Sequence, residues 1–132
     1  MDEKERTIRA LFEARARGDY AEIRALLAED VVWHEPGEAD YLGDHRGADE
    51  AVTLMRQLTE VTGGTFVLEP LEVLTTDEHA VASTRWHAER DGVRCEGEEL
   101  VVYRFADSRI AELWFFEDGF DQEAHDLVFS FR

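Results

Sequence analysis

Apolar residues recur with helical spacing at the start of the chain. Between Glu3 and Gly18 they return every three or four residues, and the glycine then supplies a helix stop. Asp19 can cap a second, shorter helix that ends before Asp30. The pattern therefore predicts two helices joined by a Gly-Asp corner.

The middle of the chain carries one strand signal and one helix signal. The residues Val31 to Trp33 predict a short strand that ends before Pro36, and a third helix is expected from Gly47 to the glycine pair at 63–64. The last half is rich in β-forming residues, in four long segments separated by turn signals. These segments predict successive antiparallel strands at 65–76, 79–90, 94–106 and 109–117.

The order of these elements defines the fold class. Two helices, a strand, a helix, a four-strand meander and a last short helix at 121–129 make an α+β domain with helices on one face of a curved sheet. A chain of 132 residues fits one domain, residues 1–132, and such a domain hides about two-thirds of its extended surface on folding. A sheet wrapped over helices can enclose a conical pocket.

Composition excludes several classes of partner. The net charge of -17, from 31 acidic and 14 basic residues, repels nucleic acids and anionic membrane surfaces. Cys95 is the one cysteine, so no intrachain disulfide can form, and the expected compartment is the cytoplasm. The sequence contains neither a signal-peptide pattern nor an apolar run of about 18 residues, so we expect no membrane partner.

Several short stretches, in their order and spacing, resemble the SnoaL-like and ketosteroid-isomerase-like family, whose fold is named after nuclear transport factor 2. They are Gly18-Asp19, DVVWHEPG, GDHRG, TGGTF, DEHAVA, AERDG and RIAELWFFED, and they span nearly the whole chain. The resemblance implies a cone-shaped α+β barrel with N-terminal helices packed on a curved, mixed, mainly antiparallel sheet. It also implies a small homodimer with an apolar cavity. It implies no single reaction, because members include isomerases, polyketide cyclases, dehydratases, hydrolases and non-enzymes.

Glu35 is the first candidate for chemistry. Aligned on the steroid isomerase pattern, Glu35 falls on the general base, and Pro36 matches as well. Burial beside Trp33 would raise the pKa of this carboxyl toward the working pH of a general base. The same alignment places the isomerase's two oxyanion donors on Leu11 and Val101, which cannot donate, so that mechanism is not expected in full. An exposed strand end is the alternative for Glu35.

Other candidate acids, bases and donors surround this strand end. Strand alternation turns Trp33 the same way as Glu35 and turns His34 to the other face unless a bulge reverses it. His34 and His45 flank the expected pocket loop, where an imidazole could act as acid, base or donor. Tyr103 could donate a hydrogen bond to a substrate carbonyl. For each, a structural role is the alternative.

The later strands supply further candidates. The register that turns Val101 inward also turns Glu99 inward, and the last strand offers Glu117 or Asp118 as a base, with its register left open. Trp86 would give a flat wall for a planar ligand, or pack as core. The residues expected to bind substrate are Trp33, Tyr41, Leu54, Met55, Trp86, Val101 and Phe115.

Together these features favour a cofactor-free homodimer that moves a proton on a small hydrophobic carbonyl compound, by isomerisation, cyclisation or dehydration. A non-catalytic ligand-binding or dimerisation domain remains open. Epoxide or ester hydrolysis is less favoured, and two inward carboxylates flanking an arginine would support it. No metal is expected, because the sequence lacks HxxEH and HxH spacing. Trp114 and Phe116 on the outer sheet face would explain the dimer.

Overall fold

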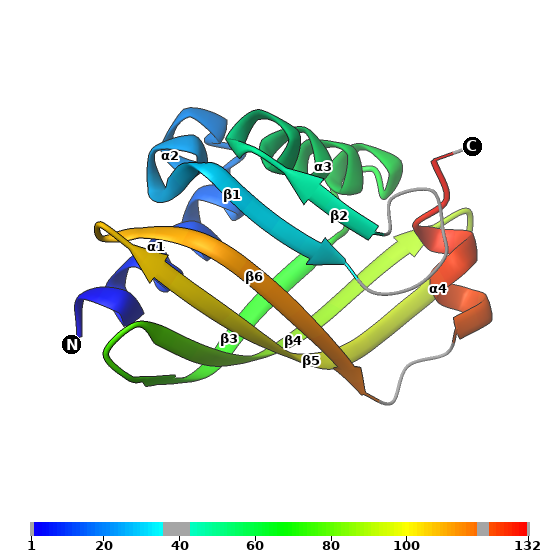
Figure 1. Ribbon diagram of the computed structural model, residues 1–132. Helices are drawn as coiled ribbons and strands as arrows, with labels where there is room; N and C mark the ends of the chain where they lie inside the picture. The colour runs from blue at the N-terminus through cyan, green and yellow to red at the C-terminus, as the bar shows by residue number, and fades with distance from the viewer. Residues whose placement is uncertain (1, 36–42, 119–121, 132) are drawn as a thin grey trace.

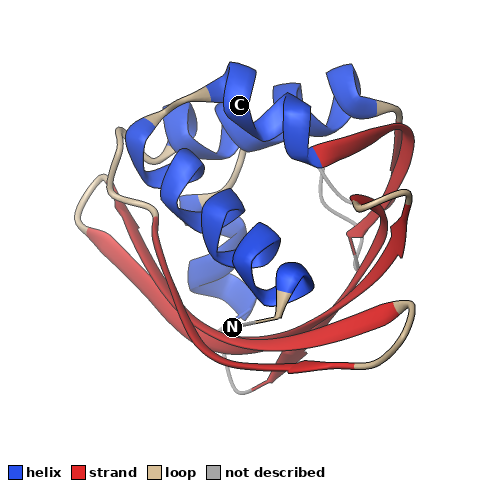
Figure 2. Ribbon diagram, turned by 90° about the vertical axis from the view of Figure 1, so that its left-hand side faces the viewer, coloured by secondary structure: helices blue, strands red, loops and turns tan. Residues whose placement is uncertain are grey.

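Helices line the concave side of a strongly curved sheet in the computed structural model (Figures 1 and 2). The structure describes residues 2–35, 43–118 and 122–131. Its helices are α1 (Glu3–Arg17), α2 (Tyr20–Leu26), α3 (Ala48–Val61) and α4 (Gln122–Val128). Its strands are β1 (Leu27–Glu35), β2 (Gly43–Arg46), β3 (Val67–Thr75), β4 (His79–Arg90), β5 (Val93–Ala106) and β6 (Arg109–Asp118). Among the described residues, no helix is long and apolar enough to span a membrane.

The sheet is mixed and open. Its strand order is β2-β1-β6-β5-β4-β3, with β1 parallel to β6 and every other neighbouring pair antiparallel. This arrangement confirms the predicted α+β class, with the N-terminal helices on a curved, mainly antiparallel sheet. The parallel β1–β6 pair matters most for the site, because it sets the ends of these two strands side by side.

The strand β2 was not predicted, since Gly43 to Arg46 carry no alternation of apolar residues. This strand exists through its antiparallel pairing with β1, in which Trp33 faces His45. The strand β1 begins at Leu27, before the predicted start at Val31, because Leu27 pairs with Ile110 of β6. Tertiary pairing decides both boundaries, and local propensity does not.

The helix α1 carries one side chain of the site on its buried face. Asp2 caps the helix by accepting a hydrogen bond from the backbone N–H of Lys4 (2.8 Å). Ile8 and Leu11 are buried on the face that meets the core. Arg15 follows Leu11 by one helical turn, so the same face that buries apolar residues carries a guanidinium toward the interior.

Gly47 directly precedes α3, and its backbone links the start of this helix to β1. Its φ of 91° and ψ of 152° lie in a region that is open almost only to glycine, and its N–H donates to the carbonyl of Val31 at 2.7 Å. We expect Gly47→Ala to lower the free energy of unfolding in urea by about 2 kcal/mol. Gly18→Asn is the control, because φ 69° and ψ 27° are left-handed values that Asn tolerates. Equal losses in the two variants would contradict this account of Gly47.

Candidate functional site

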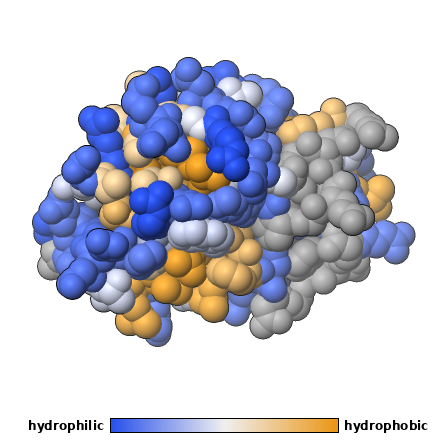
Figure 3. All heavy atoms as spheres, viewed as in Figure 1, coloured by the Kyte–Doolittle hydropathy of each residue, from blue (hydrophilic) through white to orange (hydrophobic). Residues whose placement is uncertain are grey.

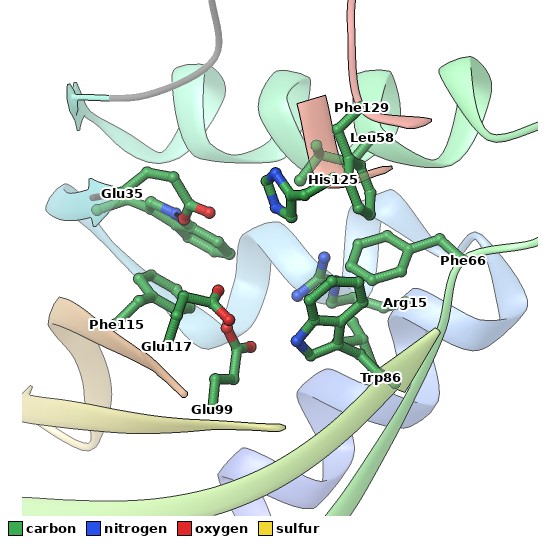
Figure 4. A pocket seen from close by; sticks show the side chains of 12 residues that line it. Arg15, Glu35, Leu58, Phe66, Trp86, Glu99, Phe115, Glu117, His125 and Phe129 are labelled. Atoms are coloured by element: carbon green, nitrogen blue, oxygen red, sulfur yellow. Dashed lines mark hydrogen bonds between the residues drawn. The ribbon is translucent and has the colours of Figure 1, made fainter. Parts of the chain in front are cut away.

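A pocket lies between the concave face of the sheet and the helices α1, α3 and α4 (Figure 4). Its free volume is about 30 Å³, room for roughly two water molecules. Its apolar lining residues are Trp33, Leu58, Phe66, Leu68, Trp86, Phe115 and Phe129. Its polar lining residues are Arg15, Glu35, Glu99, Glu117 and His125. One arginine and three acids therefore share a narrow, largely aromatic space.

Glu35 enters this pocket from the end of β1. The indole Nε1–H of Trp33 donates a hydrogen bond to Glu35 Oε2 at 2.6 Å. Burial in the pocket raises the pKa of Glu35 to about 7, although the Trp33 hydrogen bond lowers it, and Glu117 adds to the rise. The carboxyl group thus changes its protonation state near neutral pH.

The side chain of Trp33, which donates to the Glu35 carboxylate, is itself fixed by packing. Its side chain is only 2% exposed, and its ring packs on Phe115 with 4.7 Å between the ring centroids. The guanidinium of Arg15 lies 5.7 Å from the centroid of the Trp33 ring. Packing on both partners fixes the indole, so the Glu35 carboxylate has a defined position.

A pair of acids, Glu99 of β5 and Glu117 of β6, lines the pocket below Glu35 in the view of Figure 4. The two residues are direct partners in the β5–β6 register, and their carboxyl groups are hydrogen-bonded to each other. Burial, followed by this hydrogen bond, raises the pKa of Glu99 well above its usual range. Burial also raises the pKa of Glu117, against the hydrogen bonds from Glu99 and Trp86. The two carboxyl groups therefore titrate together and share a proton.

Arg15 supplies the positive charge of the pocket. Its guanidinium lies over the Trp33 ring and over the Phe66 ring, 5.8 Å from the Phe66 centroid. Burial lowers the pKa of Arg15, while Glu99, Tyr103 and Glu35 raise it. Among the described residues no carboxylate lies within 4.0 Å of its nitrogens. Its nearby acids therefore act on it from longer range.

His125 of α4 completes the pocket. Its ring contacts the rings of Trp86 and Phe129, with centroid distances of 5.7 and 4.8 Å. Burial lowers the pKa of His125, so a neutral imidazole faces the pocket. Within residues 2–35, 43–118 and 122–131, no three His, Cys, Asp or Glu side chains are grouped so that they could hold a metal ion.

The structure brings together five of the side chains that the sequence indicated. Glu35, Trp33, Trp86, Phe115 and Glu117 all line the pocket. This settles the open register of β6, because the inward acid is Glu117.

Four further candidates lie in the core rather than in the pocket lining. They are buried but do not border the free space: Leu54, Met55, Val101 and Tyr103. Tyr103 is nevertheless a neighbour of the site, because burial and the charge of Glu99 raise its pKa while Arg15 lowers it. Tyr41 and the side chain of Asp118 lie outside the part of the chain that is described.

The two histidines proposed for catalysis do not line the pocket. His34 lies on the outer face of β1, where Nδ1 is 2.7 Å from Asp44 and Nε2 is 2.6 Å from Glu112. Burial opposes charging of His34, yet the hydrogen bonds to Glu112 and Asp44 raise its pKa. His45 Nδ1 lies 3.4 Å from Glu50 of α3. Both rings therefore join secondary-structure elements, which favours the structural alternative for each.

Sequence reasoning did not propose the apolar lining residues Leu58, Phe66, Leu68 and Phe129 as binding residues. It also missed two polar lining residues, Arg15 and His125. Each lies on a helix whose residues were assigned to the core or to the surface. A signal for Arg15 was present, because a charged residue one turn after Leu11 interrupts the apolar stripe of α1. No comparable signal marks His125.

The chain belongs to the SnoaL-like family, because the sequence profile of the SnoaL-like domain matches residues 8–113. An uncharacterized protein of Mycobacterium tuberculosis, Rv0034, is 33% identical over 107 residues, which cover 80% of this chain and 82% of that protein. The crystallised protein Bal32a from a soil-derived mobile gene cassette is 28% identical, with a TM-score of 0.88 and 96% of each chain covered. IdmH of Streptomyces antibioticus has the same fold at 22% identity, with a TM-score of 0.74 and coverage of 89% of this chain and 93% of IdmH.

The raised pKa of Glu35 predicts a pH-dependent effect of its replacement. In the folded protein this pKa is about 7, against an ordinary value of 4.5, so the folded state loses stability as pH rises through this interval. Glu35→Gln cannot ionise and avoids this loss. We expect the variant to be more stable than the parent by about 2 to 3 kcal/mol near pH 8, and nearly equal to it near pH 4.

Urea unfolding at the two pH values measures the effect. The matched control is Glu98→Gln, on the same strand as Glu99 but exposed, which should show no gain near pH 8. A Glu35→Gln variant with the same difference from the parent at both pH values would show that the carboxyl is solvated.

Proposed function

We propose that this protein transfers a proton on a small hydrophobic carbonyl compound, with Glu35 as the base. One observation carries the proposal: Trp33 fixes the Glu35 carboxylate at the wall of an aromatic pocket, where its pKa is about 7. A base with this pKa is about half ionised at neutral pH and binds a proton more strongly than a solvated carboxylate does. Three carboxyl groups that face the pocket favour an enzyme over a passive binding domain.

The proposed step needs a partner for the charge that it creates. Glu35 takes a proton from the carbon next to the substrate carbonyl, and the electron pair of the broken C–H bond moves onto the carbonyl oxygen. Arg15 can stabilise the resulting oxyanion inside an apolar pocket, where such a charge is otherwise costly. The proton then returns from Glu35 to another carbon, which completes an isomerisation. Alternatively, the enolate carbon attacks a second carbonyl carbon to form a ring, and Glu35 returns the proton to the new alkoxide oxygen.

Leu11 and Val101 occupy the positions of the isomerase's two oxyanion donors, and a polar residue lies near each of them. One is a helical turn from Leu11, and the other is two strand residues from Val101. Arg15 follows Leu11 by one turn on the same face of α1. Glu99 precedes Val101 by one repeat on the same face of β5, and the proton that it shares with Glu117 would leave that hydrogen bond to reach an oxyanion. A helix and a strand thus present a cation and a neutral acid where an oxyanion hole needs donors.

The comparison with IdmH agrees with this class of reaction. IdmH is described as a putative polyketide cyclase, and ring closure of a polyketide begins with removal of a proton next to a carbonyl group. At 22% identity this likeness establishes the fold alone, so Glu35 and Arg15 carry the argument.

Exchange of substrate protons with solvent tests the proposal before the natural substrate is identified. With 2-tetralone in D₂O, we expect the protein to accelerate loss of the α-proton signals in NMR, with a rate that rises as Glu35 ionises around pH 7. Glu35→Gln should lower this rate by about 10²-fold or more, and the exposed Glu98→Gln should not. An unchanged rate in Glu35→Gln would overturn the assignment of the base.

A second candidate function is hydrolysis of an epoxide or an ester. The observation that favours it is that Arg15 lies near both Glu35 and Glu99, beside free space of about 30 Å³. One carboxylate could activate a water while the neutral acid protonates the leaving oxygen. Hydrolysis in H₂¹⁸O would place a solvent oxygen in the product, whereas proton transfer would not.

We also propose that the protein is a homodimer through the outer face of the sheet. Leu100 and Phe116 are paired across β5 and β6 and are 48% and 56% exposed, beside the neighbouring pair Val102 and Trp114. Figure 3 looks onto the outer side of β1 and β6 and shows apolar atoms gathered among hydrophilic ones. A cluster of this kind favours contact with a second copy.

Sedimentation velocity tests the dimer. We expect the parent protein to sediment as a dimer and Leu100→Glu/Phe116→Glu as a monomer. Leu127→Glu is the control, because Leu127 is 57% exposed but lies on α4. A monomeric parent protein at micromolar concentration would refute the proposal.

A further inference from the structure

Among the arginines and acids that the structure describes, Arg15 differs from most other arginines in having no nearby carboxylate partner at a position inside the fold. Within the described part of the chain, seven of those other arginines have a carboxylate oxygen within 4.0 Å: Arg9, Arg17, Arg24, Arg46, Arg85, Arg94 and Arg104. Arg15 has no such partner among the described residues, although it lies inside the fold. Burying a guanidinium without an anion is costly, and contacts with two aromatic rings recover only part of that cost.

The acids around Arg15 do not neutralise it. Burial and the hydrogen bond to Glu117 raise the pKa of Glu99 well above its usual range, and Glu35 has a pKa of about 7. Both groups lower their own charge in the pocket instead of pairing with the arginine. An incoming anion would therefore meet a fixed cation, because the remaining carboxyl of the pair, Glu117, is not among the groups that act on Arg15.

The geometry around the guanidinium favours a flat ligand. Arg15 lies between the rings of Trp33 and Phe66, at 5.7 and 5.8 Å from their centroids, and its end points into the pocket (Figure 4). Free space of about 30 Å³ leaves no room for a bulky group, so a ligand must slide between aromatic side chains that separate slightly. A planar guanidinium also binds best to two oxygens that lie in one plane.

We propose that the pocket selects a flat, conjugated ligand that carries a delocalised oxyanion, a carboxylate or an ionised enol, and that Arg15 binds this group. The inference rests on the proposed function, because both concern the same guanidinium. In the proposed reaction Arg15 stabilises an oxyanion that Glu35 creates, and here it binds an oxyanion that the ligand already carries. The net charge of -17 does not prevent entry, since charges beyond about 10 Å are largely screened at physiological salt.

Matched acid and neutral ligands test this selection by calorimetry. One pair is trans-cinnamate and trans-cinnamamide, and the other is ionised 1,3-indanedione and 1-indanone. We expect the parent protein to bind the anion of at least one pair about ten-fold more tightly than its neutral partner. The pair that shows the preference tells carboxylate from enolate.

Variants on one helix assign the preference to Arg15. Arg15→Gln should bind anion and neutral ligand with equal affinity, whereas Arg17→Gln, exposed on the same helix, should keep the preference. If Arg15→Gln fails to fold, Arg15→Lys keeps the charge without the planar fork and should retain only part of the preference. Equal affinity within both pairs for the parent protein, or binding of none of the four ligands, would overturn the inference.

The same ligands separate this inference from the proposed function. Glu35→Gln should lose proton exchange and keep the preference for the anion. If the parent protein prefers the anion but exchanges no protons, the proposed reaction fails and the ligand selection stands. If exchange persists without any preference, only the ligand selection fails.

Discussion

The hydrogen bond from the Trp33 indole to Glu35 turns the end of a strand into a candidate active site. It is 2.6 Å long, and the indole itself is fixed between Phe115 and the guanidinium of Arg15. Without it, the carboxylate at the end of β1 would be free to turn toward water. The parallel pairing of β1 with β6 then sets this carboxylate on the same concave face as Glu117. The rest of the pocket depends on that placement.

Burial of several acids in one pocket raises their pKa values, so that not all of them are ionised at neutral pH. Three carboxyl groups and one guanidinium share a space that is mostly aromatic. The Glu99–Glu117 pair shares one proton, and burial leaves Glu35 close to half-ionised at neutral pH. Burial, more than repulsion between the acids, thereby produces a neutral acid and a base that line the same pocket. This division of roles is what proton transfer between carbons or oxygens requires.

Strand alternation made the site residues on strands predictable. The polar site residues on helices were not predicted. The period of two placed Trp33 and Glu35 on one face of β1 and turned Glu99 inward on β5, because burial leaves a clear pattern on strands. Arg15 escaped notice since a single charge on an apolar helix stripe is usually solvated at its end. The strand β2 escaped because its pairing with β1, and not its composition, makes it a strand.

The protonation of Glu35 is the central claim, and it can be observed directly. Carboxyl ¹³C shifts of protein with labelled glutamate, assigned by comparison with Glu35→Gln, report the pKa of this one group. The structure predicts a titration midpoint at about 7 for Glu35. Loss of the indole donor in Trp33→Phe should raise this midpoint, because the hydrogen bond from Trp33 lowers the pKa. A midpoint near the ordinary value of 4.5, unchanged in Trp33→Phe, would mean that Glu35 faces water and that the pocket holds no base.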